Sequence, residues 1–338
     1  MQNKLARRLT YLITVPLFVF DVLRFKFTKG DFLTKHLINT FCLLGGKPGS
    51  LASKFLASRK VDFQLDSSKS ILRSYTLSFR SLEKMGWAVI PNALDSTTVG
   101  EILDISEKAK GSYRKTDSGE IIENELYFDR KNPQSVRFDY DSNDLFKYEL
   151  IQNIVSDRKI LNIAQEYLGA QPIFDFIAMW WHVKSENPDK EAAQYFHFDM
   201  DRLRWVKFFF YITDVNEESG PHVFIPKSHS DFGLPFKLRS KGYARLEDED
   251  VAKHFPKFEW KVFTGNAGTL IIEDTRGLHK GKHVLSGDRL VFQIQFTSSL
   301  FAQSALAKTT IKRHEIGAQL NEALIKFPKI FSRVRVIN

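Results

Sequence analysis

The chain has 338 residues, of which 43% are hydrophobic and 30 are phenylalanine, and a formal net charge of +9. This apolar content can offset the conformational entropy lost on folding, so the composition excludes a disordered or fibrous protein. The single cysteine, Cys42, excludes a disulfide framework and a cysteine-rich zinc site, and it fits a cytoplasmic location. Any bound metal must therefore be held by histidine and carboxylate. The length suits one large β domain with additions at its ends.

The excess positive charge is confined to the two ends of the chain. Residues 1–60 carry a net charge of +9 and residues 301–338 carry +5, whereas residues 61–300 carry −5. A mildly acidic centre does not suit a groove that follows a phosphate backbone, so we expect no nucleic-acid partner. The chain divides on this basis into a basic apolar N-terminal segment (1–60), a central domain (61–300) and a basic, helical C-terminal tail (301–338).

The N-terminal segment combines basic residues with short apolar stretches. The uncharged stretch Leu9–Phe20 has 12 residues, which are too few to span a bilayer. No small-residue cleavage site follows it, so export is not expected, and Pro16 should interrupt any long helix. Two interpretations stay open: peripheral binding to an anionic membrane, at its inner face, or helices that pack on the domain with their basic faces in solvent.

The central domain begins with helices and continues as strands. Gly86–Pro91 predicts a short strand, and a helix with apolar residues at helical spacing begins at Asp95 or Ser96. A second helix is predicted over 156–168, with Gly169 as its C-terminal cap. Beyond residue 172, aromatic and β-branched runs separated by turns predict an antiparallel sandwich or barrel, with strands at 173–183, 206–213, 223–225, 269–272 and 290–296.

Four residues in this region carry the chemistry. His197 and Asp199 are two positions apart, so on a strand their side chains point to the same side. His279 follows a glycine-rich turn and a strand, and Arg289 lies ten residues later on the polar face of the next strand. Two histidines and a carboxylate form the facial triad of non-haem iron(II) oxygenases, and an inward arginine can clamp a distal carboxylate. The set predicts an iron(II)/2-oxoglutarate dioxygenase.

His283 competes with His279 for the third ligand position. It lies only six residues before Arg289, within the expected turn, whereas His279 leaves room for a turn between two antiparallel strands. We therefore assign the metal to His197, Asp199 and His279. The other histidines of the central domain receive no metal role: His182, His222, His229 and His254.

The segment between these residues resembles the phytanoyl-CoA dioxygenase family. Phe209–Pro221 has the strand, acidic turn and Gly-Pro of that family, and Val223–His229 has its second strand and Pro-x-Ser-His ending. The resemblance covers about residues 80–300. It implies a mainly β fold with flanking helices, namely a double-stranded β-helix (jelly-roll, cupin-like) barrel. One departure is Lys227, which stands where the family usually has glycine.

The resemblance also implies a function. It assigns the same three ligands to Fe(II) and Arg289 to 2-oxoglutarate, with O2 as the other cosubstrate. The expected reaction is hydroxylation of an unactivated carbon in a small-molecule or lipid-linked substrate. Two alternatives stay open: a non-catalytic, membrane-peripheral binding protein on an oxygenase barrel, and a cupin-type metalloenzyme in which Arg289 binds a substrate anion instead. If another cation holds 2-oxoglutarate, Lys184 and Lys207 are the next candidates.

Overall fold

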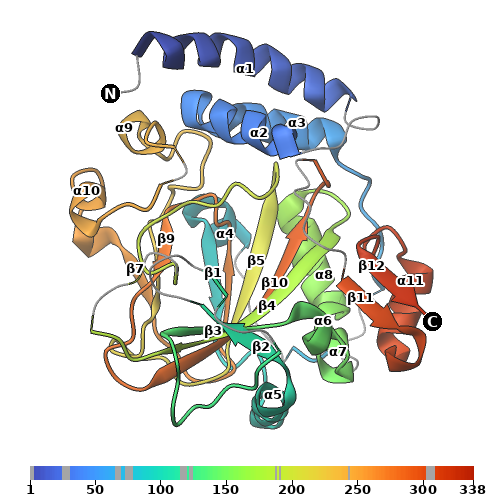
Figure 1. Cartoon of the computed structure of the whole chain (residues 1–338). Helices are drawn as coiled ribbons and strands as arrows, with labels where there is room; N and C mark the ends of the chain where they lie inside the picture. The colour runs from blue at the N-terminus through green and yellow to red at the C-terminus, as the bar shows by residue number, and fades with distance from the viewer. Residues whose placement is uncertain are drawn as a thin grey trace.

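Two antiparallel β-sheets face each other in the computed structural model, and helices cover the outer side of the larger sheet (Figure 1). The structure describes residues 4–24, 31–64, 70–72, 79–114, 120–121, 125–186, 189, 192–242, 244–301 and 309–338. Within these ranges the larger sheet has seven strands, in the order β1-β8-β5-β10-β4-β3-β2. The strands are β1 (Trp87–Ile90), β2 (Gly111–Tyr113), β3 (Arg137–Tyr140), β4 (Ile173–Val183), β5 (Trp205–Tyr211), β8 (Leu270–Glu273) and β10 (Asp288–Thr297).

A smaller sheet of three strands lies opposite the larger one. It has the order β7-β6-β9, with β6 (His222–Phe224), β7 (Lys261–Phe263) and β9 (His279–Gly281). Aromatic side chains join the two sheets. The ring of Trp87 on β1 packs edge-on against Phe263 with centroids 5.3 Å apart, and the Tyr211 hydroxyl on β5 donates to the Phe263 carbonyl at 3.0 Å. The space between the sheets is therefore partly filled, and the remainder holds the candidate site.

Strand β10 shows how the sequence divides the two faces of the larger sheet. Leu290, Phe292, Ile294 and Phe296 point outward into a core shared with the helices, whereas Arg289 and Gln293 line the space between the sheets. The predicted alternation is confirmed. The helices on the outer side are α4 (Phe79–Met85), α5 (Ser96–Lys108), α6 (Ser142–Phe146), α7 (Glu149–Val155) and α8 (Arg158–Leu168).

The predicted helix ends are also confirmed. The Asp95 carboxylate accepts a hydrogen bond from the Thr98 backbone N–H at 2.8 Å, so it caps α5. Gly169 ends α8 in the left-handed conformation with a φ of 68°.

Further along the chain, residues between β6 and β7 form three short helices: α9 (Phe236–Arg239), α10 (Asp248–Ala252) and η2 (Lys257–Glu259).

Three N-terminal helices cover one end of the domain: α1 (Lys4–Arg24), α2 (Asp31–Leu44) and α3 (Lys47–Leu56) (Figure 1). The expectation that Pro16 would interrupt a long helix is wrong, since α1 continues through it. Pro16 lies on the exposed side of α1, where solvent can satisfy the carbonyl left without its helical donor. The buried side packs on the domain, because the Phe18 ring meets Phe301 edge-on at 5.8 Å.

The C-terminal segment contains two strands as well as a helix. β11 (Thr309–Lys312) pairs in parallel with β12 (Val334–Ile337), and η3 (Arg313–Glu315) and α11 (Ala318–Lys326) lie between them. The side chains of Leu320 and Ile330 are fully buried in the core beneath the larger sheet. This segment, expected to be a helical tail, is thus packed into the domain along its described length.

Candidate active site

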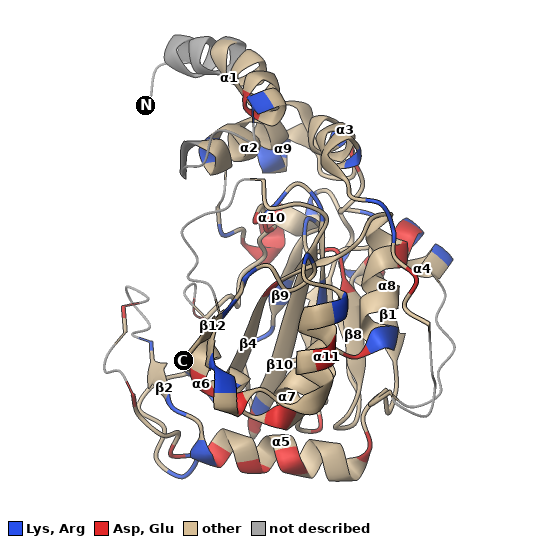
Figure 2. Ribbon diagram, turned by 90° about the vertical axis from the view of Figure 1, so that its right-hand side faces the viewer, with Lys and Arg blue, Asp and Glu red and all other residues tan. Residues whose placement is uncertain are grey.

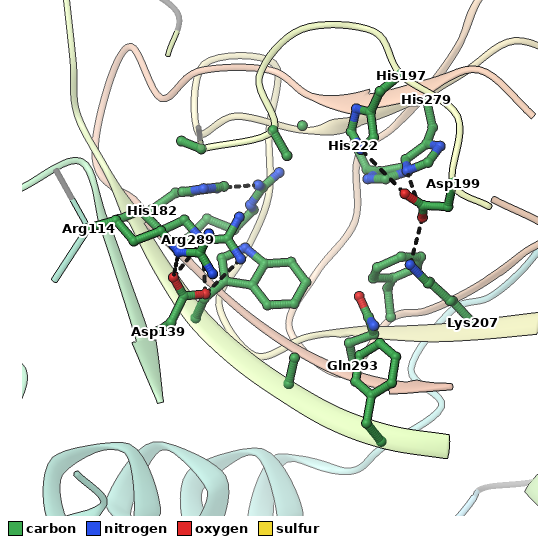
Figure 3. Close-up of a pocket in the computed structure, with 18 of the residues that line it drawn as sticks. Arg114, Asp139, His182, His197, Asp199, Lys207, His222, His279, Arg289 and Gln293 are labelled. Carbon is green, nitrogen blue, oxygen red and sulfur yellow. Dashed lines mark hydrogen bonds and ion pairs between the residues drawn. The ribbon is translucent and has the colours of Figure 1, made fainter. Parts of the chain in front are cut away.

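His197, Asp199 and His279 come together between the two sheets (Figure 3). His197 and His279 pair their backbones, with N–H to carbonyl distances of 3.0 and 2.9 Å, and the Asp199 N–H donates to the Thr275 carbonyl at 2.8 Å. These bonds hold the three side chains on one surface. One ligand atom from each lies within 4.8 Å of the others, and each histidine Nε2 faces the Asp199 carboxylate, at 3.9 Å for His197 and 3.5 Å for His279.

Both histidines have the tautomer that a metal requires. Nδ1 of His197 lies 2.9 Å from the Tyr195 carbonyl, and Nδ1 of His279 lies 2.9 Å from the Gly277 carbonyl. A carbonyl oxygen can only accept, so each Nδ1 carries the proton and each Nε2 presents a lone pair. Burial lowers the pKa of both imidazoles and keeps them neutral.

Asp199 is ionised despite being buried. Burial opposes its charge, but the Lys207 ammonium outweighs this effect and holds the pKa of the carboxyl well below its usual range. The Lys207 ammonium on β5 donates to Oδ2 of Asp199 at 2.6 Å and lies 3.4 Å from Asp201. The donor set is therefore two neutral imidazole nitrogens and one carboxylate. Each group is in the protonation state in which it can bind a metal, and this combination suits iron(II).

Arg289 lies in the same cavity, away from the His-Asp-His cluster (Figure 3). Its side chain is almost fully buried, and its Nη2 donates to Nδ1 of His182 at 2.7 Å. Its Nε and Nη1 have no hydrogen-bond partner among the described residues. Burial lowers the pKa of Arg289 to about 10, so the guanidinium stays charged at neutral pH. A Cβ on Gly281 would lie 2.9 Å from Nη2, so glycine leaves room for this side chain.

A buried cation with two unpaired N–H groups calls for an anion. Leaving such donors without partners costs about 1–3 kcal/mol each, more for charged groups. A carboxylate oxygen that accepts from Nε or Nη1 would satisfy such a donor with a charge-assisted hydrogen bond. Arg289 therefore fits the distal carboxylate of 2-oxoglutarate, and the cavity of about 350 Å³ lies within the usual range for small-molecule sites.

Two further arginines line the cavity, but they are already paired. Arg137 on β3 contacts Asp139 at 2.7 Å, and Arg114 contacts the same carboxylate at 2.6 Å. A second cavity of about 620 Å³ is also lined by Arg114 and Asp139, so the two cavities adjoin at this ion pair.

A buried His-Glu pair lies beside the cluster and was not predicted. Nε2 of His222 on β6 lies 2.7 Å from the Glu273 carboxylate on β8, and the His222 ring stacks near His279 with centroids 5.5 Å apart. Burial raises the pKa of Glu273 to about 8 and lowers that of His222 to about 3. Period 2 places Glu273 on the same strand face as Ile271, but it does not show that His222 would meet this carboxylate.

The structure also places the other histidines that the sequence analysis considered. Among the described residues, His283 belongs neither to the group that could hold a metal nor to the cavity lining. His182 and His222 line the cavity without belonging to that group. Lys227, the departure from the glycine of the family pattern, has a φ of 68°. The turn thus keeps a conformation that favours glycine and tolerates lysine at a cost.

The chain is similar to one known protein family and to several solved structures. The family model described as phytanoyl-CoA dioxygenase matches residues 82–291, which is more than half of the chain and confirms the resemblance. No curated protein matches. Similar solved structures include HygX from Streptomyces hygroscopicus with nickel and 2-oxoglutarate bound (16% identity, TM-score 0.48, 72% of this chain and 94% of that chain). Another is EctD from S. alaskensis with bound Fe (13%, 0.47, 71% and 83%).

Proposed function

The chain belongs to the phytanoyl-CoA dioxygenase family, and we propose on this premise that it is an iron(II)- and 2-oxoglutarate-dependent hydroxylase. The metal and cosubstrate supply the oxidant, since O2 and 2-oxoglutarate are consumed while succinate, carbon dioxide and a hydroxylated product are released. His197, Asp199 and His279 hold the metal through their Nε2 and carboxylate atoms. The substrate is a small molecule or a lipid-linked compound with an unactivated carbon.

The observation that carries this proposal is the Arg289 guanidinium. It is a buried cation with two unpaired nitrogens, and it lines the same cavity as a complete His-Asp-His cluster. A non-catalytic binding protein on an oxygenase barrel would need neither the buried arginine nor the complete His-Asp-His cluster. A cupin-type metalloenzyme can keep the cluster, but it needs Arg289 only if its own substrate is an anion.

The substrate approaches, in this proposal, from the second cavity. The inner cavity of about 350 Å³ is near the lower end of the usual range and must also hold the cosubstrate. The adjoining cavity of about 620 Å³ has space for the remote part of a larger substrate. The ion pair between Arg114 and Asp139 separates the two spaces and is positioned to contact the substrate.

Succinate release tests the proposal. The full chain is incubated with Fe(II), 2-oxoglutarate and O2, with and without an extract of small molecules and lipids. We expect succinate only when iron and 2-oxoglutarate are both present, more of it with the extract, and none from His279→Ala. His283→Ala is the matched control and should retain turnover, because His283 is outside the cluster. Metal binding without 2-oxoglutarate consumption would favour the cupin-type enzyme, and absence of metal binding would favour the binding protein.

A further inference from the structure

The outer face of α1 is apolar and uncovered. Five side chains between residues 13 and 23 are exposed, with half of Phe20 and 64% of Leu23 accessible to solvent. They occupy one side of the helix at helical spacing, and the buried residues occupy the other side. This apolar face of α1 consists of Ile13, Leu17, Val19, Phe20 and Leu23.

Charge is distributed unevenly around this face. The one acid of α1, Asp21, points inward, where it is buried and lies 2.6 Å from Nδ1 of His36 on α2. Arg24, in contrast, is on the exposed side, with its guanidinium 4.9 Å from the Phe20 ring centroid. The sequence of α1 adds Lys4, Arg7 and Arg8 in its first turns and no second acid. The described outer side of α1 therefore joins apolar side chains to one arginine, Arg24.

The neighbouring helix α3 repeats this combination. Leu51 and Phe55 are exposed, and so are Lys47 and Lys54. The four positions are successively four, three and one residues apart, which places them on the same side of the helix. Figure 2 shows the described part of α1 almost without charge, with basic residues on the helices below it. No helix in the described part of the chain is long and apolar enough to span a membrane. The geometry suits a helix that lies along a surface.

We propose that the apolar face of α1 docks on the surface of an anionic phospholipid bilayer. The exposed apolar side chains enter the boundary between headgroups and acyl chains, and the flanking lysines and arginines contact lipid phosphates. Charge complementarity selects this occupant, since a second copy of the same chain would bring like charges together. The inner side of α1 stays packed on the domain, so binding requires no unfolding.

Flotation of the full chain with liposomes tests this docking. Vesicles of phosphatidylcholine alone are compared with vesicles that also contain phosphatidylglycerol, at low and high salt. We expect the chain to float with the anionic vesicles, and added salt to reduce the bound fraction, because salt screens the basic residues. The double change Leu17→Glu and Phe20→Glu should lower the bound fraction at least tenfold.

Ile325→Glu is the matched control, because Ile325 on α11 is 73% exposed and is not on this face. It should bind vesicles like the unchanged chain, and both variants should keep the parent's circular dichroism and metal stoichiometry. Equal binding by the α1 double variant, or no binding to anionic vesicles by the unchanged chain, would overturn the proposal. If the unchanged chain binds no vesicles but is a dimer in light scattering, and the α1 double variant is a monomer, the face joins two copies of the chain instead.

Discussion

Replacement of Arg289 by alanine should weaken 2-oxoglutarate binding without removing the metal. In the structure two nitrogens of Arg289, Nε and Nη1, are buried without partners, and the third, Nη2, is committed to His182. Loss of one partner from a buried, hydrogen-bonded charge pair costs about 2–5 kcal/mol. At about 1.4 kcal/mol per tenfold change, the Kd for 2-oxoglutarate should rise by a factor between about 30 and several thousand.

The measurement is calorimetric titration of 2-oxoglutarate into the full chain loaded with Ni(II), without oxygen, so that no turnover occurs. Arg137→Ala is the matched control, since Arg137 lines the same cavity but its guanidinium is bound to Asp139. We expect the Kd of this variant to change less than about threefold, or about 0.6 kcal/mol, because Arg137 is already paired with Asp139. Metal stoichiometry should stay at one per chain in both variants.

Two results would refute this reasoning. If Arg289→Ala binds 2-oxoglutarate within threefold of the unchanged chain, another cation holds the distal carboxylate, and Lys207 is the first to test because its ammonium lines the cavity. If Arg137→Ala loses as much affinity as Arg289→Ala, the cosubstrate displaces Asp139 instead of occupying the unpaired nitrogens.

Three further predictions follow from the same structure. His197→Ala with Asp199→Ala removes two of three ligands, so metal per chain should fall from one to near zero in elemental analysis; full occupancy would place the metal elsewhere. Lys227→Gly relieves a left-handed φ of 68° and should raise the free energy of unfolding by about 0.5–1 kcal/mol in urea; a loss would mean that the lysine side chain contributes more than the strain costs. The Arg276 guanidinium lowers the pKa of Asp274 to about 2, below its unfolded value of about 4. This difference contributes about 2 kcal/mol of stability above pH 4, and the contribution is lost as the pH falls towards 2. In Arg276→Met this acid-dependent loss should disappear from the unfolding curves and the stability at pH 7 should be lower; an unchanged acid profile would assign it to other carboxyls.

Local signals made part of this fold predictable. Asp95 and Gly169 mark helix ends through bonds and dihedral angles within a few residues, and the alternation along β10 is set by neighbours two positions apart. The strands β2, β7 and β9 have only three residues each, so their sequence lacks a period to recognise. Their existence depends on pairing with distant segments, which no local pattern records.

The candidate site divides in the same way. His197 and Asp199 are recognisable because period 2 places them together, and His279 and Arg289 because a turn and two strands require that spacing. The contact between Lys207 and Asp199 depends on how β5 runs beside the ligand segment, and the approach of His222 to Glu273 depends on strands from both sheets. Sequence reasoning missed His222 and Glu273 because each is unremarkable until the two sheets face each other.

The N-terminal helices and the segment that carries His197 and Asp199 share one hydrophobic core. Phe198, between two of the ligands in sequence, packs its ring against Phe41 of α2 with centroids 5.2 Å apart, and Met200 belongs to the same buried cluster. Deletion of residues 1–60 would therefore expose the back of the ligand segment as well as remove the apolar face of α1. A fall in activity after such a deletion would have two causes. Substitutions confined to the outer side of α1 separate them, because that side faces away from Phe41 and the ligands.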